Sequence, residues 1–171
     1  MAGKVLVAYA THYGSTQEVA EAVAARLGER GFDVEVRPAK EADPSDGYAA
    51  VVVGMALYFF RIHRDARKFL SRHRKPLSGM PVAVFAMGPV EDKPEQFTDA
   101  RARLDKTLAK YEWLSPVDVA LFGGKLDPQG LRFPHNNPAM KNVPASDLRD
   151  WAAIEAWADG VATRLDDTGE A

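Results

Sequence analysis

The sequence contains no cysteine among its 171 residues. This absence excludes disulfide bonds, thiol nucleophiles, cysteine-ligated zinc sites and iron–sulfur clusters. The histidines, at positions 12, 63, 73 and 135, are scattered and lack the spacing of paired metal ligands. We therefore predict no metal site.

A hydrophobic run long enough to cross a membrane is also missing. The longest uncharged stretch, residues 48–60, is too short for a membrane-spanning helix and is better interpreted as a buried strand. The opening "MAGKVLVAYA" lacks the flanking regions of a signal peptide. We predict a cytoplasmic protein with no membrane span, for which peripheral contact with a membrane stays open.

The charge balance lacks a strong excess of either sign. The chain carries 22 Lys/Arg and 24 Asp/Glu, which gives a net charge of −2. A nucleic-acid binder usually has a clear basic excess, so we expect no nucleic-acid partner. With 46% apolar residues, the chain is long enough for one domain with a real core, which we place at residues 1–165. The ending "DDTGEA", residues 166–171, is expected to be a disordered tail.

Short apolar runs alternate with helical patterns along the chain. Five strands are expected, at residues 5–10, 32–37, 49–54, 81–88 and 117–124. Helical stripes are expected at residues 16–30, 65–73 and 94–111, and in a last helix that begins at Ser146. Strands that alternate with helices indicate an α/β fold, in which a parallel sheet is covered on both faces.

In such a sheet, ligands bind beyond the carboxyl ends of the strands. The loops that follow the first, third and fourth strands are therefore the candidates for a site. They are residues 11–16, 55–61 and 87–94.

The first of these loops, "THYGST", joins a buried strand directly to a helix. Ser15 and Glu18 match a capping box, which would explain those two residues but not Thr11 or Thr16. The same geometry suits an anion, because the start of a helix presents unpaired N–H groups and a partial positive charge. The loop has no lysine or arginine, so it is not a Walker A loop, and neutral donors would have to hold a phosphate. Both interpretations stay open at this point.

Aromatic residues gather where the third strand should end. Tyr58, Phe59 and Phe60 are consecutive there. Such residues belong either to the core or a lid, or to a surface on which a flat ligand lies. After the fourth strand, Gly88 and Pro89 predict a tight turn whose backbone can approach a ligand closely.

Four segments together form a pattern that extends over most of the chain. They are the T-x-x-G-x-T loop, the "G-x-A-L-Y" strand exit with a histidine shortly after it, "RKFLSRHRKPL" and "PVAVFAMGP". This pattern, from Lys4 to Leu165, resembles the flavodoxin-domain family and, within it, the menaquinone-dependent protoporphyrinogen oxidase group. The resemblance implies a flavodoxin-like three-layer sandwich with a five-stranded parallel sheet in the order 2-1-3-4-5. The sequence departs from the pattern at Phe60, where relatives often carry a small residue.

The cofactor that this resemblance implies is FMN. By position, its phosphate would be held by Thr11, His12, Tyr13, Gly14, Ser15 and Thr16. One side of the flavin ring would lie along Ala56, Leu57, Tyr58 and Phe59. The other side would be approached by Met87, Gly88 and Pro89.

A basic stretch follows the third strand. Seven Lys/Arg and one acidic residue occur between Arg61 and Lys75. Such runs are most often solvated helix faces, and we favour this interpretation for residues 67–75. The start of the stretch lies beside the expected flavin loop. Arg61, His63 and Arg64 are therefore candidates to receive a carboxylate-bearing substrate or an acidic partner.

The segment at residues 124–146 is a long loop rich in proline, asparagine and glycine. Loops of this length are usually functional or disordered. Its apolar members Leu131, Phe133 and Met140 indicate that it packs against the domain. We predict that it covers the edge of the site or forms a partner contact.

No catalytic dyad is visible in the sequence, which suits chemistry performed by a flavin. The resemblance implies an FMN-dependent oxidoreductase that passes electrons from a small-molecule substrate, protoporphyrinogen in that group, to a quinone-type acceptor. The alternative is a flavodoxin-type electron carrier that acts through redox partner proteins. Such carriers are usually strongly acidic, and a net charge of −2 with a basic stretch counts against this alternative. A flavin-free interaction domain is the third interpretation.

Overall fold

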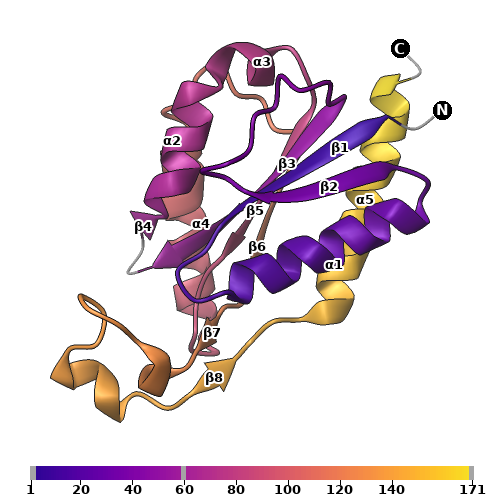
Figure 1. Ribbon diagram of the computed structural model, residues 1–171. Helices are drawn as coiled ribbons and strands as arrows, with labels where there is room; N and C mark the ends of the chain where they lie inside the picture. Colours follow the sequence, from indigo (N-terminus) through magenta and orange to yellow (C-terminus); the bar gives the residue numbers. More distant parts are fainter. Residues whose placement is uncertain (1–2, 59–60, 170–171) are drawn as a thin grey trace.

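The computed structural model describes residues 3–58 and 61–169. Its central sheet has the strand order β2-β1-β3-β5-β6, with all neighbouring pairs parallel (Figure 1). The strands are β1 (Lys4–Ala10), β2 (Asp33–Pro38), β3 (Ala50–Tyr58), β5 (Val82–Met87) and β6 (Asp118–Phe122). This is the predicted order 2-1-3-4-5, so the predicted fold class is confirmed.

Burial explains why the central strands are almost continuously apolar. β3 and β5 are buried along nearly their whole length, because helices cover both faces of the sheet. β2 lies at the edge, and its alternating "DVEVR" is only partly buried. Gly54 in β3 has a specific role, since a Cβ atom there would lie 2.2 Å from the Phe85 ring on β5. The glycine thus leaves the space that the Phe85 ring occupies.

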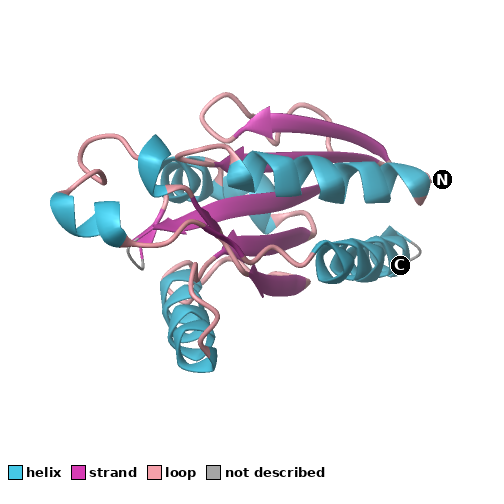
Figure 2. Ribbon diagram, turned by 90° about the horizontal axis from the view of Figure 1, so that it is seen from below, coloured by secondary structure: helices cyan, strands magenta, loops and turns pink. Residues whose placement is uncertain are grey.

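Helices form the two outer layers (Figures 1 and 2). α1 (Ser15–Glu29) and α5 (Trp151–Gly169) pack their apolar stripes on one face of the sheet. α2 (Arg64–Arg72), α3 (Arg74–Ser78) and α4 (Pro94–Leu108) cover the other face. The structure is therefore a three-layer sandwich with its core divided by the sheet.

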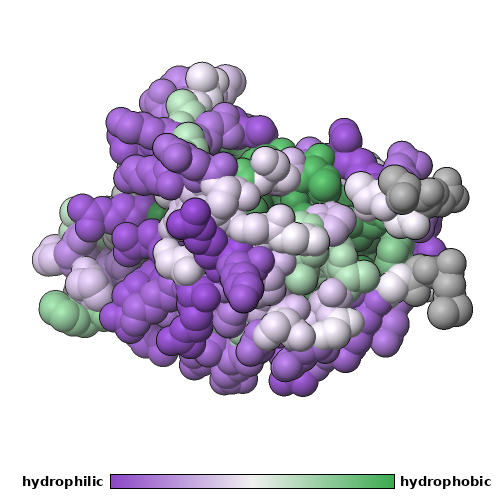
Figure 3. All heavy atoms as spheres, turned by 90° about the horizontal axis from the view of Figure 1, so that it is seen from above, coloured by the Kyte–Doolittle hydropathy of each residue, from purple (hydrophilic) through white to green (hydrophobic). Residues whose placement is uncertain are grey.

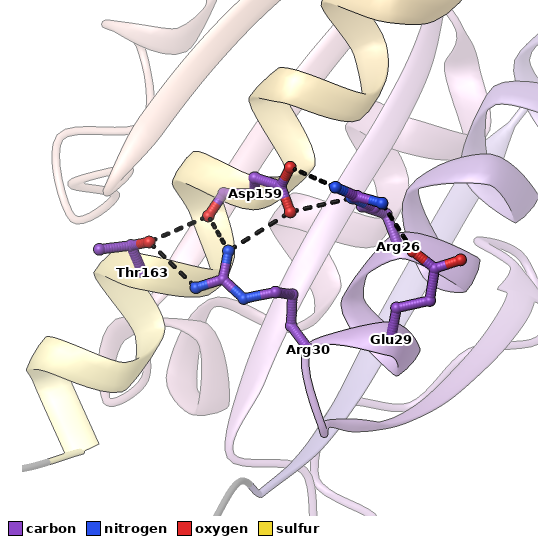
Figure 4. Close-up of polar contacts among 5 residues, drawn as sticks. All are labelled: Arg26, Glu29, Arg30, Asp159 and Thr163. Atoms are coloured by element: carbon purple, nitrogen blue, oxygen red, sulfur yellow. Dashed lines mark hydrogen bonds and ion pairs between the residues drawn. The ribbon is translucent and has the colours of Figure 1, made fainter.

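Ion pairs join α1 to α5 within the helical layer that these two helices form (Figure 4). Arg26 donates to both carboxylate oxygens of Asp159, at 3.0 Å and 2.9 Å. Arg30 donates to the same carboxylate at 3.3 Å and to the Thr163 hydroxyl at 3.3 Å. The two helices are thus held together by polar contacts as well as by their apolar stripes.

Several sequence-based boundaries were wrong. β3 continues to Tyr58 and pairs antiparallel with a short strand β4 (Arg61–Ile62), where a loop at residues 55–61 was expected. Phe59 and Phe60, between these strands, lie outside the described residues. α5 begins at Trp151 instead of Ser146. It also continues to Gly169, so the described part of the expected disordered tail is helical.

The long loop at residues 124–146 contains short elements of its own. A two-stranded antiparallel sheet joins its ends, formed by β7 (Lys125–Leu126) and β8 (Ser146–Asp147). Between these strands lie two 3-10 helices, η1 (Pro128–Gly130) and η2 (Pro138–Asn142). The loop extends from the lower left of the domain in Figure 1.

The register places the carboxyl ends of the strands at one edge of the sheet. Ala10 pairs with Met55, Met55 with Ala86, and Ala86 with Leu121. The loops that follow β1, β3 and β5 therefore meet at this edge. At the opposite edge, beside the two chain ends, Figure 3 shows hydrophobic atoms in a hollow of a mostly hydrophilic surface. A pocket there is lined in part by Val5, Phe32, Ala50 and Leu165.

Candidate functional site

The amino terminus of α1 is not capped by any side chain that the structure describes. Its N-cap residue is Gly14, which has a left-handed backbone with φ 92°. Ser15 is the first residue inside the helix, and Glu18 forms an ion pair with Arg149 at 2.9 Å. The capping box does not form, because a left-handed glycine makes the turn instead. The Gly14 N–H donates to Thr11 Oγ1 at 2.9 Å, which closes the loop on itself.

Thr16 presents an unpartnered hydroxyl at the same helix end. The residue is completely buried, and its Oγ1 atom has no hydrogen-bond partner among residues 3–58 and 61–169. A buried polar atom of this kind is uncommon and costs stability. A hydroxyl that can donate, beside uncapped N–H groups, is the chemistry that binds an anion at a helix amino terminus.

One hollow brings the predicted residues from all three loops together. Its lining includes Thr11, His12, Tyr13 and Ser15 from the first loop, Ala56, Leu57 and Tyr58 from β3, and Met87 and Gly88 from the end of β5. Gly14 and Thr16 belong to the same strand-to-helix turn, and Pro89 lines the neighbouring cavity. Phe59 lies outside the described residues.

The neighbouring cavity is apolar. It has a volume of about 160 Å³, is partly open to solvent, and lies between the ends of β3 and β5, the start of α4 and the long loop. Leu57, Pro89, Val90, Leu126 and Met140 contribute to its lining. Met140 of the long loop therefore lies against the domain, which agrees with the prediction that the apolar residues of this loop pack there. Leu131 is also buried, whereas Phe133 is 89% exposed, so the packing prediction was wrong for Phe133.

Two backbone segments meet closely beside the hollow. The Gly124 N–H donates to the Pro89 carbonyl at 2.8 Å. A Cβ atom at Gly124 would lie 2.6 Å from the Gly88 carbonyl oxygen. Only glycine fits there, so the start of the long loop is held against the turn after β5.

The middle of the long loop lies on the loop after β1. Arg132 Nη2 donates to the His12 carbonyl at 3.1 Å, and the Arg132 N–H donates to the Tyr13 hydroxyl at 3.2 Å. The Tyr13 hydroxyl also hydrogen-bonds His135 Nδ1 at 2.7 Å. Sequence reasoning missed Arg132 and His135, because these contacts join residues about 120 positions apart and no local motif signals them.

The flavodoxin domain family matches residues 6–141. The chain belongs to the flavodoxin-domain family. It is 28% identical over 126 residues to the protoporphyrinogen IX dehydrogenase [quinone] of Escherichia coli strain K12, covering 72% of this chain and 69% of that protein. Membership of this family implies a flavin-binding site and classes the chain as a flavodoxin-like oxidoreductase.

Solved structures share the fold at low sequence identity. Oxidised flavodoxin 1 from Bacillus cereus superposes with a TM-score of 0.59 at 15% identity, covering 96% of this chain and 97% of that chain. Rubredoxin oxygen:oxidoreductase from Desulfovibrio gigas gives a TM-score of 0.60 at 16% identity, covering 98% of this chain and 37% of that one. These structures establish the flavodoxin-like fold.

Three histidines that are scattered in the sequence come together in this flavodoxin-domain protein. The His12 ring lies 4.2 Å from the His63 ring and 5.0 Å from the His135 ring, measured between centroids. Burial, with the nearby His63 and His135, lowers the pKa of His12 to about 4, so His12 is neutral at pH 7. Within the described part of the chain, no group of three His, Asp or Glu side chains could hold a metal ion.

The predicted substrate or partner residues differ in their surroundings. His63 caps α2, because its Nδ1 atom accepts a hydrogen bond from the Asp65 N–H at 3.0 Å. Burial lowers the pKa of His63. Arg61 and Arg64 are exposed, and neither forms an ion pair with a described residue. These two arginines are therefore available for an external anion, whereas His63 has a structural role at the helix start.

None of the helices formed by residues 3–58 and 61–169 is long and apolar enough to cross a bilayer.

Proposed function

We propose that this chain is an FMN-dependent oxidoreductase that passes electrons from a reduced small-molecule substrate to a quinone-type acceptor. The observation that carries the proposal is the completely buried Thr16 hydroxyl, which lacks a partner at an uncapped helix start. A phosphate oxygen at this position would accept from that hydroxyl and from the first N–H groups of α1. The relative in Escherichia coli, named as a quinone-dependent dehydrogenase, supports the choice of acceptor.

The residues present fit FMN. Its phosphate would be held by the backbone N–H and hydroxyl groups of Thr11, His12, Tyr13, Gly14, Ser15 and Thr16. Its ring would lie against Ala56, Leu57, Tyr58 and Phe59 on one side and Met87, Gly88 and Pro89 on the other. When bound, the flavin would accept electrons from the substrate and pass them to the acceptor, while the protein binds and orients the reactants.

The substrate side of the site favours a ligand with an apolar body and acidic groups. The cavity beside the flavin residues is lined mainly by apolar side chains, which suit a large ring system. Arg61 and Arg64 are exposed cations at the same end of β3, and either could receive a carboxylate. Protoporphyrinogen IX has both properties, so it is the first substrate to test.

The first experiment is a visible absorption spectrum of the purified protein, before and after titration with FMN. We expect the bands of a bound flavin. The loaded protein is then mixed without oxygen with protoporphyrinogen IX and the soluble quinone menadione, and porphyrin fluorescence is followed. Flavin-free protein is the matched control.

The outcomes separate the candidate functions. Many porphyrin molecules formed per flavin, with no other protein present, support an enzyme. Protoporphyrinogen loses six electrons on oxidation and a flavin accepts two, so a single reduction of each flavin yields at most one porphyrin per three flavins. A yield within that limit, together with turnover only when a flavodoxin reductase and an acceptor protein are added, would favour the electron carrier. If no flavin is bound even after titration, so that the spectrum remains that of free FMN, the proposal is refuted and the interaction domain is left.

A further inference from the structure

The phosphate group of FMN poses an electrostatic problem for the loop after β1. A phosphate monoester carries close to two negative charges at neutral pH. Residues 11–16 contain no lysine or arginine. The single histidine of the loop, His12, is neutral at pH 7 because of its burial and its histidine neighbours. Within the loop, only the helix start and hydroxyl groups favour the anion.

Arg132 brings a permanent positive charge to this loop from the long loop. Its Nη2 atom donates to the His12 carbonyl at 3.1 Å, and its guanidinium lies 5.4 Å from the centre of the Tyr13 ring. A guanidinium has five N–H donors, and the described contacts of Arg132 use one of them. The residue is exposed, so its remaining donors are accessible to a ligand.

Two cations at the ends of the long loop, Lys125 and Arg149, lie next to carboxylates. The Arg149 side chain is 4% exposed and pairs with Glu18 at 2.9 Å and with Asp147 at 2.7 Å. Lys125 lies opposite Asp147 in the β7–β8 pair, and the pKa of that carboxyl is lowered mainly by its hydrogen bond with Arg149 and further by the charge of Lys125. Arg132, in contrast, forms no ion pair with any carboxylate among residues 3–58 and 61–169. Of these three cations, Arg132 therefore has the least compensated charge.

We propose that Arg132 is a phosphate-recognition residue, which supplies from the long loop the positive charge that the loop after β1 lacks. The proposal deepens the proposed function and rests on it, because it assumes that FMN binds at this loop. It gives the long loop a role in selecting the phosphorylated cofactor, in addition to lining the apolar cavity. The Tyr13 ring beneath the guanidinium would keep Arg132 oriented toward the loop.

Riboflavin provides the test, since it is FMN without the phosphate. Both flavins are titrated into wild-type protein and three variants, Arg132→Ala, Arg132→Lys and Arg72→Ala, and the quenching of flavin fluorescence gives each dissociation constant. Arg72 is an exposed arginine at the far end of α2, so its variant is the matched control for loss of one charge. Circular dichroism checks that every variant is folded.

We expect Arg132→Ala to weaken FMN binding about tenfold, the size of one charge-assisted hydrogen bond. Riboflavin binding should change by less than about twofold, because it has no phosphate for the guanidinium to contact. Arg132→Lys should restore part of the FMN affinity, since it keeps the charge but not the planar fork. Added salt should weaken FMN binding more in the wild type than in Arg132→Ala.

Two results would overturn the inference while leaving the proposed function intact. Equal losses for FMN and riboflavin in Arg132→Ala would mean that Arg132 only holds the long loop in place. Equal affinity of the wild type for both flavins would mean that the phosphate is not recognised. If the wild type binds neither flavin, the proposed function itself fails, and the inference fails with it.

Discussion

The two ends of α1 differ in how completely their polar groups are satisfied. At the carboxyl end, Arg26 and Arg30 share the Asp159 carboxylate of α5 (Figure 4). At the amino end, Gly14 provides no side-chain cap and the Thr16 hydroxyl has no partner in the described part of the chain. One helix therefore combines a closed structural end with an end that keeps hydrogen-bonding capacity for a ligand. A buried hydroxyl without a partner at a helix start is informative, because a helix start is a place where an anion can bind.

The largest change in stability should come from a core residue near the carboxyl end of α1. Leu27 is fully buried in the layer formed by α1 and α5. Leu27→Ala should lower the free energy of unfolding by about 3 kcal/mol, because it removes buried methyl groups and leaves a cavity. Urea unfolding measures the loss. FMN affinity of the still folded variant should stay within about twofold of the wild type, and a large loss of affinity would show that the two ends are not independent.

A substitution at the amino end of α1 should raise the free energy of unfolding instead of lowering it. Thr16→Val replaces the unpartnered hydroxyl with a methyl group of similar size. We expect the flavin-free variant to gain about 1 kcal/mol in free energy of unfolding, since a buried unsatisfied group is removed. FMN affinity should fall about tenfold, because one donor to the phosphate is lost. Parallel urea unfolding and flavin titration check both signs, and a variant that is less stable and binds FMN normally would contradict the assignment.

The smallest effect should come from the ion pairs, which are partly exposed to solvent. Asp159→Asn should lower the melting temperature by on the order of 2 °C at pH 7. Hydrogen bonds from Arg26 hold the pKa of the Asp159 carboxyl below its ordinary value of 3.8. The charged carboxylate therefore stabilises the fold above that value, and the contribution is lost as the pH falls through the lower folded-state pKa. The difference between wild type and variant should shrink below about pH 4 in thermal melts, whereas a constant difference would mean that charge is not the cause.

The sequence was sufficient to predict the layers of the fold, because that prediction depends on local patterns. Runs such as "AAVVVG" and the stripe of Val19, Val23 and Leu27 have the periods of a buried strand and an amphipathic helix. The end of β3 was placed too early, since Ala56, Leu57 and Tyr58 fit a strand as well as a loop. The start of α5 was placed too early for a similar reason, because Ser146 resembles a cap but pairs in β8.

The candidate site was only partly predictable. The loop at residues 11–16 has a local signature, although the same letters also matched a capping box, and only the backbone of Gly14 distinguishes the two interpretations. The contacts of Arg132 and His135 with that loop could not be foreseen, because they depend on how residues 124–146 fold back over the domain. A single sequence carries no periodic signal for such contacts between distant residues.

The short β7–β8 sheet and the close contact of Gly124 have a consequence for how such proteins diversify. Lys125 pairs with Asp147, and the Leu148 N–H donates to the Gly124 carbonyl at 2.9 Å, so the long loop leaves and re-enters the domain at nearly the same point. A segment with adjacent ends can be lengthened, shortened or exchanged at little entropic cost and without disturbing the parallel sheet. The part of the chain that borders the site can therefore evolve as a separate module, while the sheet and the loop after β1 stay unchanged.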